Sequence, residues 1–321
     1  MYNSLSLYDP SISTKNVGDE IISESVCREL MDIFPLTQFL KFSSHSVRSY
    51  EMLKRANSTD ISIVGGSNLL SPKMLRYRQF KVSPLDFILT NELVLLGTGW
   101  QCYQNNVDFL AKYFYRKCLS SKYIHSVRDD YTAERLKSVG VSNVVNTGCP
   151  TMWRLDEAHC KKIPHRKSKD VIFTLTDYSK DYDKDKVFFD TLKENYDDIY
   201  YWPQGLNDID YIKELGIYSE VKIVPPRLSD YNDFLDNNKC DYIGTRLHGG
   251  IKALQKFKRT IIIGIDNRAI EKNKDFNITV INREQIESLD DLINIEFETK
   301  IKLNLENINI FKSQFNSVLG V

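Results

Sequence analysis

The chain is predicted to be an α/β protein built from two Rossmann-like domains that face each other across a cleft. Short runs of apolar and β-branched residues alternate along it with segments whose apolar residues recur at helical spacing. Such alternation favours parallel, doubly wound sheets, because each parallel strand needs a crossover to reach the next. A charged, irregular stretch at about residues 156–169 separates this pattern from a second one. We interpret that stretch as a linker, since a short charge run is usually solvated.

Length and composition set the broad class. The 321 residues suffice for two domains of ordinary size, and 42% hydrophobic residues can build their cores. Lys plus Arg and Asp plus Glu both number 43, so the formal charge is zero and predicts no general attraction to nucleic acid. No apolar segment approaches the length of a membrane span, and residues 1–13 lack a secretory pattern, so we expect a soluble, cytoplasmic protein. The six cysteines form no CxxC pair, which favours reduced, buried thiols.

The first domain is expected over residues 1–158 and opens on a strand at about residues 5–8. The loop and helix that follow carry Asn16, Gly18 and Asp19 to the carboxyl end of that strand, where open α/β sheets bind ligands. These residues are therefore candidates for a substrate site. An equally good interpretation is that Asn16 and Asp19 only cap the helix.

The same alternation continues through the rest of this domain. Strands are predicted at about residues 61–64, 93–96, 123–127 and 143–146, and helices at about 46–56, 107–119 and 132–139. Candidate ligand contacts lie at the ends of several of these strands, namely Gly65, Gly66, Asn68, Gly97, Gly99 and Arg128. Turn geometry alone explains any single glycine, but a parallel sheet would gather all of these ends along one edge.

The second domain is expected over residues 168–300 and is followed by a helical tail at residues 301–321. Its strands are predicted at about residues 171–176, 199–202, 221–224, 240–244 and 259–265, and its helices at about 184–194 and 228–237. Gln204 follows one of these strands and is a candidate contact for a sugar or a donor substrate.

The most informative stretch is the turn Arg246-Leu247-His248-Gly249-Gly250, which follows a strand and opens a helix. Glycines at a helix start let a ligand approach the backbone, and the N–H groups and dipole of the helix attract an anion. Arg246 adds a fork suited to phosphate or carboxylate, and His248 adds a group that can transfer a proton near neutral pH. Many α/β proteins contain such a turn for structural reasons, so by itself it favours a binding site and a structural role equally.

Five segments taken together resemble the polysaccharide pyruvyl transferase family. They are Asn16-Val17-Gly18-Asp19-Glu20, Val64-Gly65-Gly66, Gly97-Thr98-Gly99, Val127-Arg128-Asp129 and Arg246-Leu247-His248-Gly249-Gly250. The likeness extends from about residue 16 to residue 268, and the Arg-x-His-Gly turn is its most specific part. Two departures are visible: Gly148-Cys149 stands where an aspartate is common, and Asn16-Val17-Gly18 replaces a Gly-Asn-x-Gly order.

This resemblance implies a GT-B-like fold, with the acceptor on the first domain and the donor on the second. It implies phosphoenolpyruvate as the donor substrate, with no cofactor, and a sugar of a cell-surface polysaccharide or its precursor as the acceptor. The product would be a pyruvate ketal. A lipid-linked acceptor would bring the protein to the inner face of the membrane as a peripheral protein without a transmembrane segment. No carboxylate cluster or His-x-x-x-His spacing stands out, so we expect no metal.

The expected chemistry assigns roles to a few residues. Phosphoenolpyruvate carries a carboxylate and a phosphate, so Arg246, Arg128 and the amides of the glycine turn are candidate donors to it. His248 is the candidate general acid for the methylene carbon, and Asp19 is a candidate base for the sugar hydroxyl. Two alternatives stay open: a GT-B glycosyltransferase that uses a nucleotide sugar, and an inactive homologue that only holds a glycan or an anion.

Overall fold

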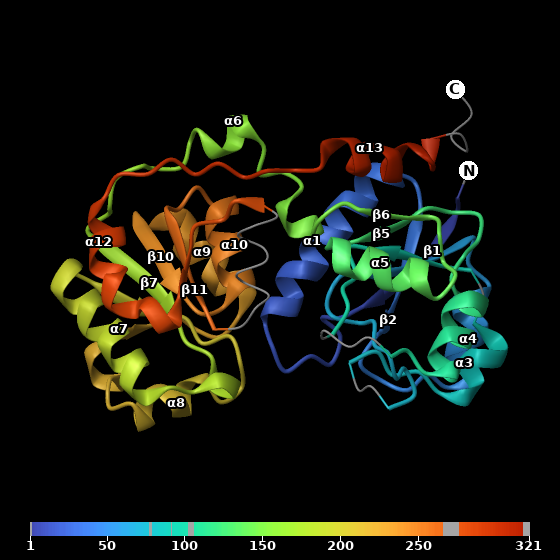
Figure 1. Cartoon of the computed structure of the whole chain (residues 1–321), viewed down its shortest axis with the longest axis horizontal. Coiled ribbons are helices and arrows are strands. Elements are labelled where there is room, and N and C mark those ends of the chain that lie inside the picture. Colours follow the sequence, from blue (N-terminus) through green and yellow to red (C-terminus); the bar gives the residue numbers. More distant parts are fainter. Residues whose placement is uncertain (1, 77–78, 91, 102–105, 266–275, 317–321) are drawn as a thin grey trace. The chain divides into compact units, whose positions relative to one another are not determined.

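A computed structural model describes residues 2–76, 79–90, 92–101, 106–265 and 276–316 of the chain. The chain divides into two compact units (Figure 1). The first contains Met1–Thr14, Ile22–Trp153 and Asn304–Val321, and the second contains Lys15–Ile21 and Arg154–Leu303. The loop that carries Asn16 and Gly18 therefore belongs to the second unit, and the C-terminal segment belongs to the first.

The first unit is built around a parallel sheet with the strand order β2-β1-β3-β4. These strands are β1 (Ser4–Asp9), β2 (Gln38–Ser43), β3 (Ile61–Gly65) and β4 (Leu93–Leu96), and β5 (His125–Val127) and β6 (Val144–Asn146) form a second parallel pair. The helices are α1 (Gly18–Ile33), of which the part from Ile22 belongs here, α2 (Tyr50–Asn57), α3 (Pro84–Leu89), α4 (Phe109–Cys118), α5 (Asp130–Ser138) and α13 (Leu305–Ser313). A parallel bridge between Thr98 and Val127 places β5 beside the loop that follows β4.

Alternate residues of these strands pack into two hydrophobic cores. Ile63 and Val94 pack with apolar residues of α1 and α13, whereas Val64 and Leu95 pack with apolar residues of α4. Successive side chains of a strand point to opposite faces, so a strand covered on both faces reads as a continuous apolar run. This is why β3 and β4 are recognisable in the sequence.

A buried histidine in this unit has a fixed charge state. His125 Nδ1 accepts the backbone N–H of Leu95 at 3.2 Å, and Nε2 donates to the carbonyl of Ser120 at 2.9 Å, so the ring is neutral. Burial lowers the pKa of His125 from 6.5 to about 4. Below pH 6.5 the unfolded chain therefore binds a proton that the folded chain excludes until about pH 4.

The free energy of unfolding is expected to fall as the pH drops from 6.5 towards 4, with His125 contributing roughly 3 kcal/mol to the fall. Above pH 6.5 the ring is neutral in both states and contributes no pH dependence. Urea unfolding at about pH 7 and about pH 5 should show a smaller pH effect in His125→Gln than in the wild type. Equal effects in the two proteins would contradict the prediction.

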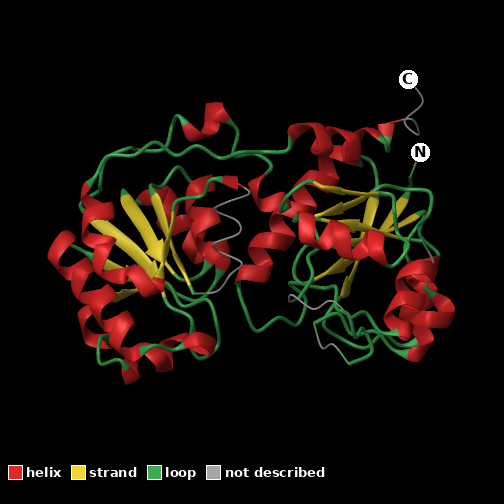
Figure 2. Cartoon of the chain, in the orientation of Figure 1, coloured by secondary structure: helices red, strands yellow, loops and turns green. Residues whose placement is uncertain are grey.

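The second unit contains one parallel sheet with the strand order β12-β11-β10-β7-β8-β9. Its strands are β7 (Asp170–Thr174), β8 (Ile199–Tyr201), β9 (Lys222–Ile223), β10 (Cys240–Gly244), β11 (Thr260–Gly264) and β12 (Val280–Asn282). Its helices are α6 (Glu157–Cys160), α7 (Tyr182–Asn195), α8 (Asp208–Glu214), α9 (Leu228–Asn237), α10 (Leu247–Gln255) and α12 (Leu289–Asn294). Helices cover both faces of the sheet, with α7 and α12 on one face and α9 and α10 on the other (Figure 2).

The predicted α/β class with parallel sheets is confirmed. The sequence pattern did not predict five elements: β2, α3, α6, α8 and β12. The strands β2 and β12 lie at sheet edges and are partly exposed, so they lack the continuous apolar run of a buried parallel strand. The helices α3 and α8 have six and seven residues, which is too short for a helical period to emerge.

Some other expectations concern particular segments. The predicted linker contains the short helix α6, and the described part of the tail at 301–321 starts with residues outside any helix and continues as α13. Five cysteines are free and buried, as expected, and Cys102 lies outside the described residues. Residues 266–268, at the end of the family resemblance, also lie outside them. In the described part of the chain, no helix combines the length and apolarity needed to cross a membrane.

Candidate functional site

The candidate site of the second unit lies where the order of strands reverses. From β7 the chain continues to β8 and β9 on one side, whereas β10, β11 and β12 lie on the other side. Open α/β sheets bind ligands outside the carboxyl ends of their strands at such a switch point. Here those ends are Thr174 and Gly244, and a Cβ at Gly244 would lie only 2.7 Å from the backbone of Thr174. Glycine thus permits the close approach of β7 and β10, directly before the turn that carries Arg246.

Arg246 is buried at this switch point and is held by two carboxylates. Its Nη2 lies 2.5 Å from Oδ1 of Asp208 and 3.0 Å from Oδ1 of Asp177. The guanidinium lies over the ring of Tyr178, 5.2 Å from its centroid, and Nε donates to the carbonyl of Leu175 at 3.2 Å. Burial is the largest single effect and would lower the pKa of Arg246, but the charge and hydrogen bond of Asp208, together with Tyr178 and Asp177, raise the pKa above its ordinary value. Arg246 is therefore a fixed cation in a defined position.

Asp208 holds several groups of the site in fixed positions. It is fully buried at the first residue of α8, and its Oδ2 accepts the backbone N–H groups of Gln204 and Gly205 at 2.9 and 2.6 Å. Since the same carboxylate contacts Arg246, it ties the loop after β8 to the turn after β10. Neither Asp208 nor Asp177 is among the site residues predicted from the sequence. For Asp208 the available signal was an aspartate opening a helix three residues after Gly205, in the loop that follows a strand.

Gln204 joins the loop 15–21 to this site. The backbone N–H of Val17 donates to its carbonyl at 2.9 Å, and its side-chain Nε2 donates to Oδ1 of Asn16 at 2.9 Å. A Cβ at Gly18 would overlap this Nε2, so the contact requires glycine there. Gln204 is only 4% exposed, and its Oε1 has no hydrogen-bond partner among the described residues. A buried acceptor in this state suits a ligand hydroxyl, because a buried polar atom without a partner is unfavourable.

Asn16 also accepts the backbone N–H of Gly18 at 3.1 Å, close to the start of α1. The alternative of a local structural role is therefore present in the structure alongside the contact with Gln204. Asp19 lies in the first turn of α1, in the segment that belongs to the second unit.

Aromatic side chains hold the backbone of the turn at the start of α10 in place. Tyr242 donates to the carbonyl of Arg246 at 2.7 Å, and Tyr231 donates to the carbonyl of Gly249 at 2.9 Å. Trp202 stacks on Tyr231 with ring centroids 3.8 Å apart. Burial raises the pKa of both tyrosines, so their hydroxyl groups stay protonated and act as donors. The backbone of the turn is thus fixed before any ligand binds.

His248 is the second residue of α10 and is partly exposed. The N-cap position of this helix is Arg246, whose side chain makes no capping hydrogen bond. The first N–H groups of a helix have no partner within it, so the amides around His248 and Gly249 are suited to an anion. A Cβ at Gly250 would overlap Ile262, so this second glycine serves close packing on β11.

In the first unit, Arg128 lies against the loop that follows β4. Its side chain is mostly buried, and Nε donates to Oδ2 of Asp129 at 3.1 Å. A Cβ at Gly99 would overlap the Nε end of Arg128. Thr98 Oγ1 and Trp100 Nε1 are buried in the same loop and have no hydrogen-bond partner within the described part of the chain. This loop therefore combines a cation with two polar atoms that a ligand can satisfy.

The other candidate glycines of the first unit contact neighbouring elements. A Cβ at Gly66 would overlap Ile22 of α1, one at Gly65 would lie 2.9 Å from Val26, and one at Gly97 would overlap Pro150. These three glycines therefore permit close packing, and Gly66 and Gly97 also have positive φ angles of 66° and 64°. Pro150 belongs to the buried segment that departs from the family pattern at Gly148-Cys149.

The structure groups the candidate residues in two sets. Asn16, Gly18, Asp19, Gln204, Arg246, Leu247, His248, Gly249 and Gly250 belong to the second unit, and Gly65, Gly66, Asn68, Gly97, Gly99 and Arg128 belong to the first. In the described residues, no three His, Cys, Asp or Glu side chains group as a metal site.

Gly99→Ala is expected to separate function from stability. The added methyl group would displace the flexible end of Arg128, so the free energy of unfolding should change by less than about 1 kcal/mol. The guanidinium would nevertheless lose its position, and the KM of a substrate that it contacts should rise about tenfold. Arg128→Gln serves as the comparison and should raise the same KM. An unchanged KM in both variants would remove Arg128 from the substrate site.

The model of the polysaccharide pyruvyl transferase family matches residues 16–267, which is most of the chain. The chain belongs to this family. Its motifs at the end of β10 and around Asn16 and Arg128 fall inside the matched region. A search of curated protein sequences finds no match.

Solved structures share the fold at low sequence identity. The UDP-GlcNAc 2-epimerase of Methanocaldococcus jannaschii has a TM-score of 0.58 and 11% identity, with 99% of each chain covered. The same enzyme in complex with UDP-GlcNAc and UDP has a TM-score of 0.55 and 9% identity, with 99% of each chain covered. MnaA of S. aureus, solved with UDP, has a TM-score of 0.53 and 11% identity, with 98% of this chain and 97% of the other covered. These likenesses confirm the predicted GT-B-like architecture of two Rossmann-like units.

Proposed function

We propose that this member of the polysaccharide pyruvyl transferase family transfers pyruvate from phosphoenolpyruvate to a sugar of a cell-surface polysaccharide or its precursor, forming a ketal. The observation that carries the proposal is the rigid Arg246-Leu247-His248-Gly249 turn at the switch point of the second sheet. It combines a fixed cation, the amino end of a helix and a histidine, which are the groups that an anionic enol ester needs. No cofactor enters this proposal.

The donor is proposed to bind at the start of α10, with its phosphate or carboxylate on the helix amides and Arg246. Asp208 is fully buried and holds the guanidinium in place, whereas Asp177 is 15% exposed. Asp177 is thus the carboxylate that a bound anion would replace at Arg246. Phosphoenolpyruvate would then make the contact with Arg246 that Asp177 makes when no donor is bound.

The reaction moves two protons. The methylene carbon of phosphoenolpyruvate takes one proton as a sugar hydroxyl adds to the neighbouring carbon, and phosphate then leaves as a second hydroxyl closes the ketal. One hydroxyl proton replaces the proton given to the methylene carbon, and the other leaves with phosphate. We assign the donation to His248 and the removal from the hydroxyl to Asp19, with Gln204 Oε1 accepting a hydrogen bond from a sugar hydroxyl.

The acceptor is proposed to bind on the first unit, at the loop that holds Gly99 and Arg128. Arg128, expected from the sequence to contact phosphoenolpyruvate, is assigned to the acceptor in this proposal. A lipid-linked acceptor would require the protein to act in the cytoplasm at the inner face of the membrane. This part of the proposal rests on the family and on the polar atoms left without partners around Thr98 and Trp100.

Thermal unfolding in the presence of candidate donors tests the proposal. A ligand that binds the folded state raises the melting temperature, by an amount set by its concentration relative to Kd. Phosphoenolpyruvate should raise it, and inorganic phosphate should raise it less. A rise with UDP-GlcNAc but not with phosphoenolpyruvate would overturn the proposal in favour of glycosyl transfer. Binding of phosphoenolpyruvate without phosphate release on any glycan acceptor would indicate a binding protein instead.

Asp177→Asn is expected to tighten donor binding. The side chains of Arg246, Asp177 and Asp208 carry a net charge of −1, which the substitution brings to zero while keeping the shape of the side chain. An anion should then bind about tenfold more tightly, because it no longer competes with a carboxylate. Calorimetric titration with phosphoenolpyruvate measures the change, and Asp183→Asn on the exposed start of α7 controls for net charge. Weaker binding in Asp177→Asn would show that the donor does not replace Asp177.

A further inference from the structure

We propose that one face of the first unit docks onto a lipid bilayer with anionic headgroups. This face, here called the α2–α4 face, consists of exposed side chains of three consecutive helices. They are Tyr50 and Lys54 of α2, Ile88 of α3, and Phe109, Lys112 and Tyr113 of α4. The inference is independent of the proposed reaction, since attachment to a membrane requires no turnover.

The apolar side chains of the α2–α4 face are large and strongly exposed. Phe109 is 78% exposed and Ile88 is 68% exposed. Phe109 and Tyr113 lie one turn apart on the same side of α4, and Tyr113 stacks on Phe87 of α3 with ring centroids 6.2 Å apart. The exposed groups of α3 and α4 therefore form a continuous surface. Clustered apolar exposure of this kind marks an interaction site.

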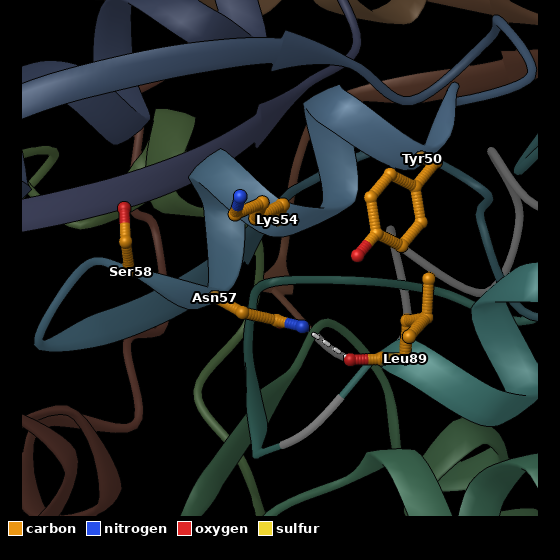
Figure 3. A pocket seen from close by; sticks show the side chains of 5 residues that line it. All are labelled: Tyr50, Lys54, Asn57, Ser58 and Leu89. Carbon is orange, nitrogen blue, oxygen red and sulfur yellow. Dashed lines mark hydrogen bonds between the residues drawn. The ribbon is translucent and has the colours of Figure 1, made fainter.

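A hollow of about 250 Å³ extends the face between α2 and α3 (Figure 3). Tyr50 and Leu89 supply apolar walls, and Lys54, Asn57 and Ser58 supply polar groups. Asn57 Nδ2 donates to the carbonyl of Leu89, which joins the two helices across the hollow. A cation beside an apolar wall suits a lipid phosphate, whose acyl chains continue into the bilayer.

The charges of this face are positive and lack carboxylate partners. Within the described residues, Lys54, Arg55 and Lys112 make no ion pair, and the one acidic side chain that the three helices expose is Glu51. The other acid of these helices, Asp86, is buried and paired with Arg48.

Some exposed lysines of the second unit differ in this respect. Lys180 pairs with Glu214, and Lys193 pairs with Glu220. The α2–α4 face thus places cations without ion pairs beside exposed aromatic groups, in a chain of zero net charge. That arrangement is complementary to an anionic surface.

The mixture of residues favours a bilayer over a protein partner. Lysine is depleted in the centre of protein interfaces, where aromatic and other apolar groups are fully buried. At a membrane interface, by contrast, aromatic rings sit at the level of the headgroups and lysines extend their charged ends towards phosphates. On α4, Lys112 and Tyr113 flank Phe109 on the helix surface, so a cationic and an apolar side chain both neighbour the most exposed aromatic ring of the face.

Vesicle flotation with the full chain tests the inference. The wild type should bind vesicles of phosphatidylcholine containing about one third phosphatidylglycerol, bind pure phosphatidylcholine at least about fivefold more weakly, and dissociate at high salt. The double variant Phe109→Ser, Ile88→Ser should bind anionic vesicles about tenfold more weakly, and Lys54→Glu, Lys112→Glu should lose the preference for them. Both pairs are exposed, so the melting temperature should stay within a few degrees of the wild type.

Matched controls exist in the same chain. Leu36→Ser removes an apolar side chain that is 76% exposed but lies between α1 and β2, and Lys239→Glu reverses an exposed charge between α9 and β10. Both should bind vesicles like the wild type. The inference is overturned if the wild type does not bind anionic vesicles, or if the α2–α4 variants bind as tightly as the controls. It is also overturned if the wild type forms dimers without vesicle binding and Phe109→Ser abolishes them, since the face then pairs two copies of the chain.

Discussion

Replacing His248 with glutamine should lower turnover by roughly two to four orders of magnitude while leaving donor affinity within a few fold of the wild type. Glutamine keeps a polar side chain at the second position of α10 but cannot deliver a proton to carbon. The loss should appear in kcat, because a general acid acts in the transition state and contributes little to binding the ground state. The release of phosphate from phosphoenolpyruvate in the presence of a glycan acceptor measures it.

A control for this prediction is His165→Gln, which changes an exposed histidine of the same unit. It should leave turnover unchanged. Near-normal turnover in His248→Gln would remove the histidine from the chemistry, and a loss confined to KM would make it a binding group. After either result, the calorimetric titration of Asp177→Asn would still test whether an anion binds at Arg246 and the α10 amides.

Asp208→Asn should lower the free energy of unfolding by about 3–5 kcal/mol, because it leaves Arg246 charged and buried without its closest partner. The carboxylate also accepts two backbone N–H groups at the start of the loop after β8, so the position of Gln204 should change as well. Urea unfolding measures the loss, and phosphoenolpyruvate binding should weaken in the protein that remains folded.

The exposed Asp210→Asn is the matched control on α8, where the partner Lys213 lies 3.5 Å away and the side chain of Asp210 is 68% exposed. A surface pair of this kind should contribute less than about 1 kcal/mol. The double variant Asp208→Asn, Arg246→Met should be more stable than Asp208→Asn alone, since it removes the buried guanidinium that has lost its closest partner. A loss below about 1 kcal/mol in Asp208→Asn would show that other groups hold Arg246.

Local sequence patterns predicted most of the fold. The strands β3, β4, β7, β10 and β11 are buried on both faces and therefore stand out as short apolar runs, and the longer helices show their period. The order of strands and helices then implied parallel sheets with their carboxyl ends at one edge. The elements missed were edge strands and helices of one or two turns, in which partial exposure or shortness removes the pattern.

For the candidate site, the sequence determined which residues lie at strand ends and helix starts, including Arg246, His248 and Gln204. Only the tertiary structure decided what surrounds them. Asp177 and Asp208 contact Arg246 from segments that follow β7 and β8, and Asn16 contacts Gln204 across 188 positions of sequence. A local stretch of sequence indicates which conformation a residue and its near neighbours prefer. Ion pairs and hydrogen bonds form between groups that are close in space, and that closeness depends on the order in which the strands assemble into the sheet.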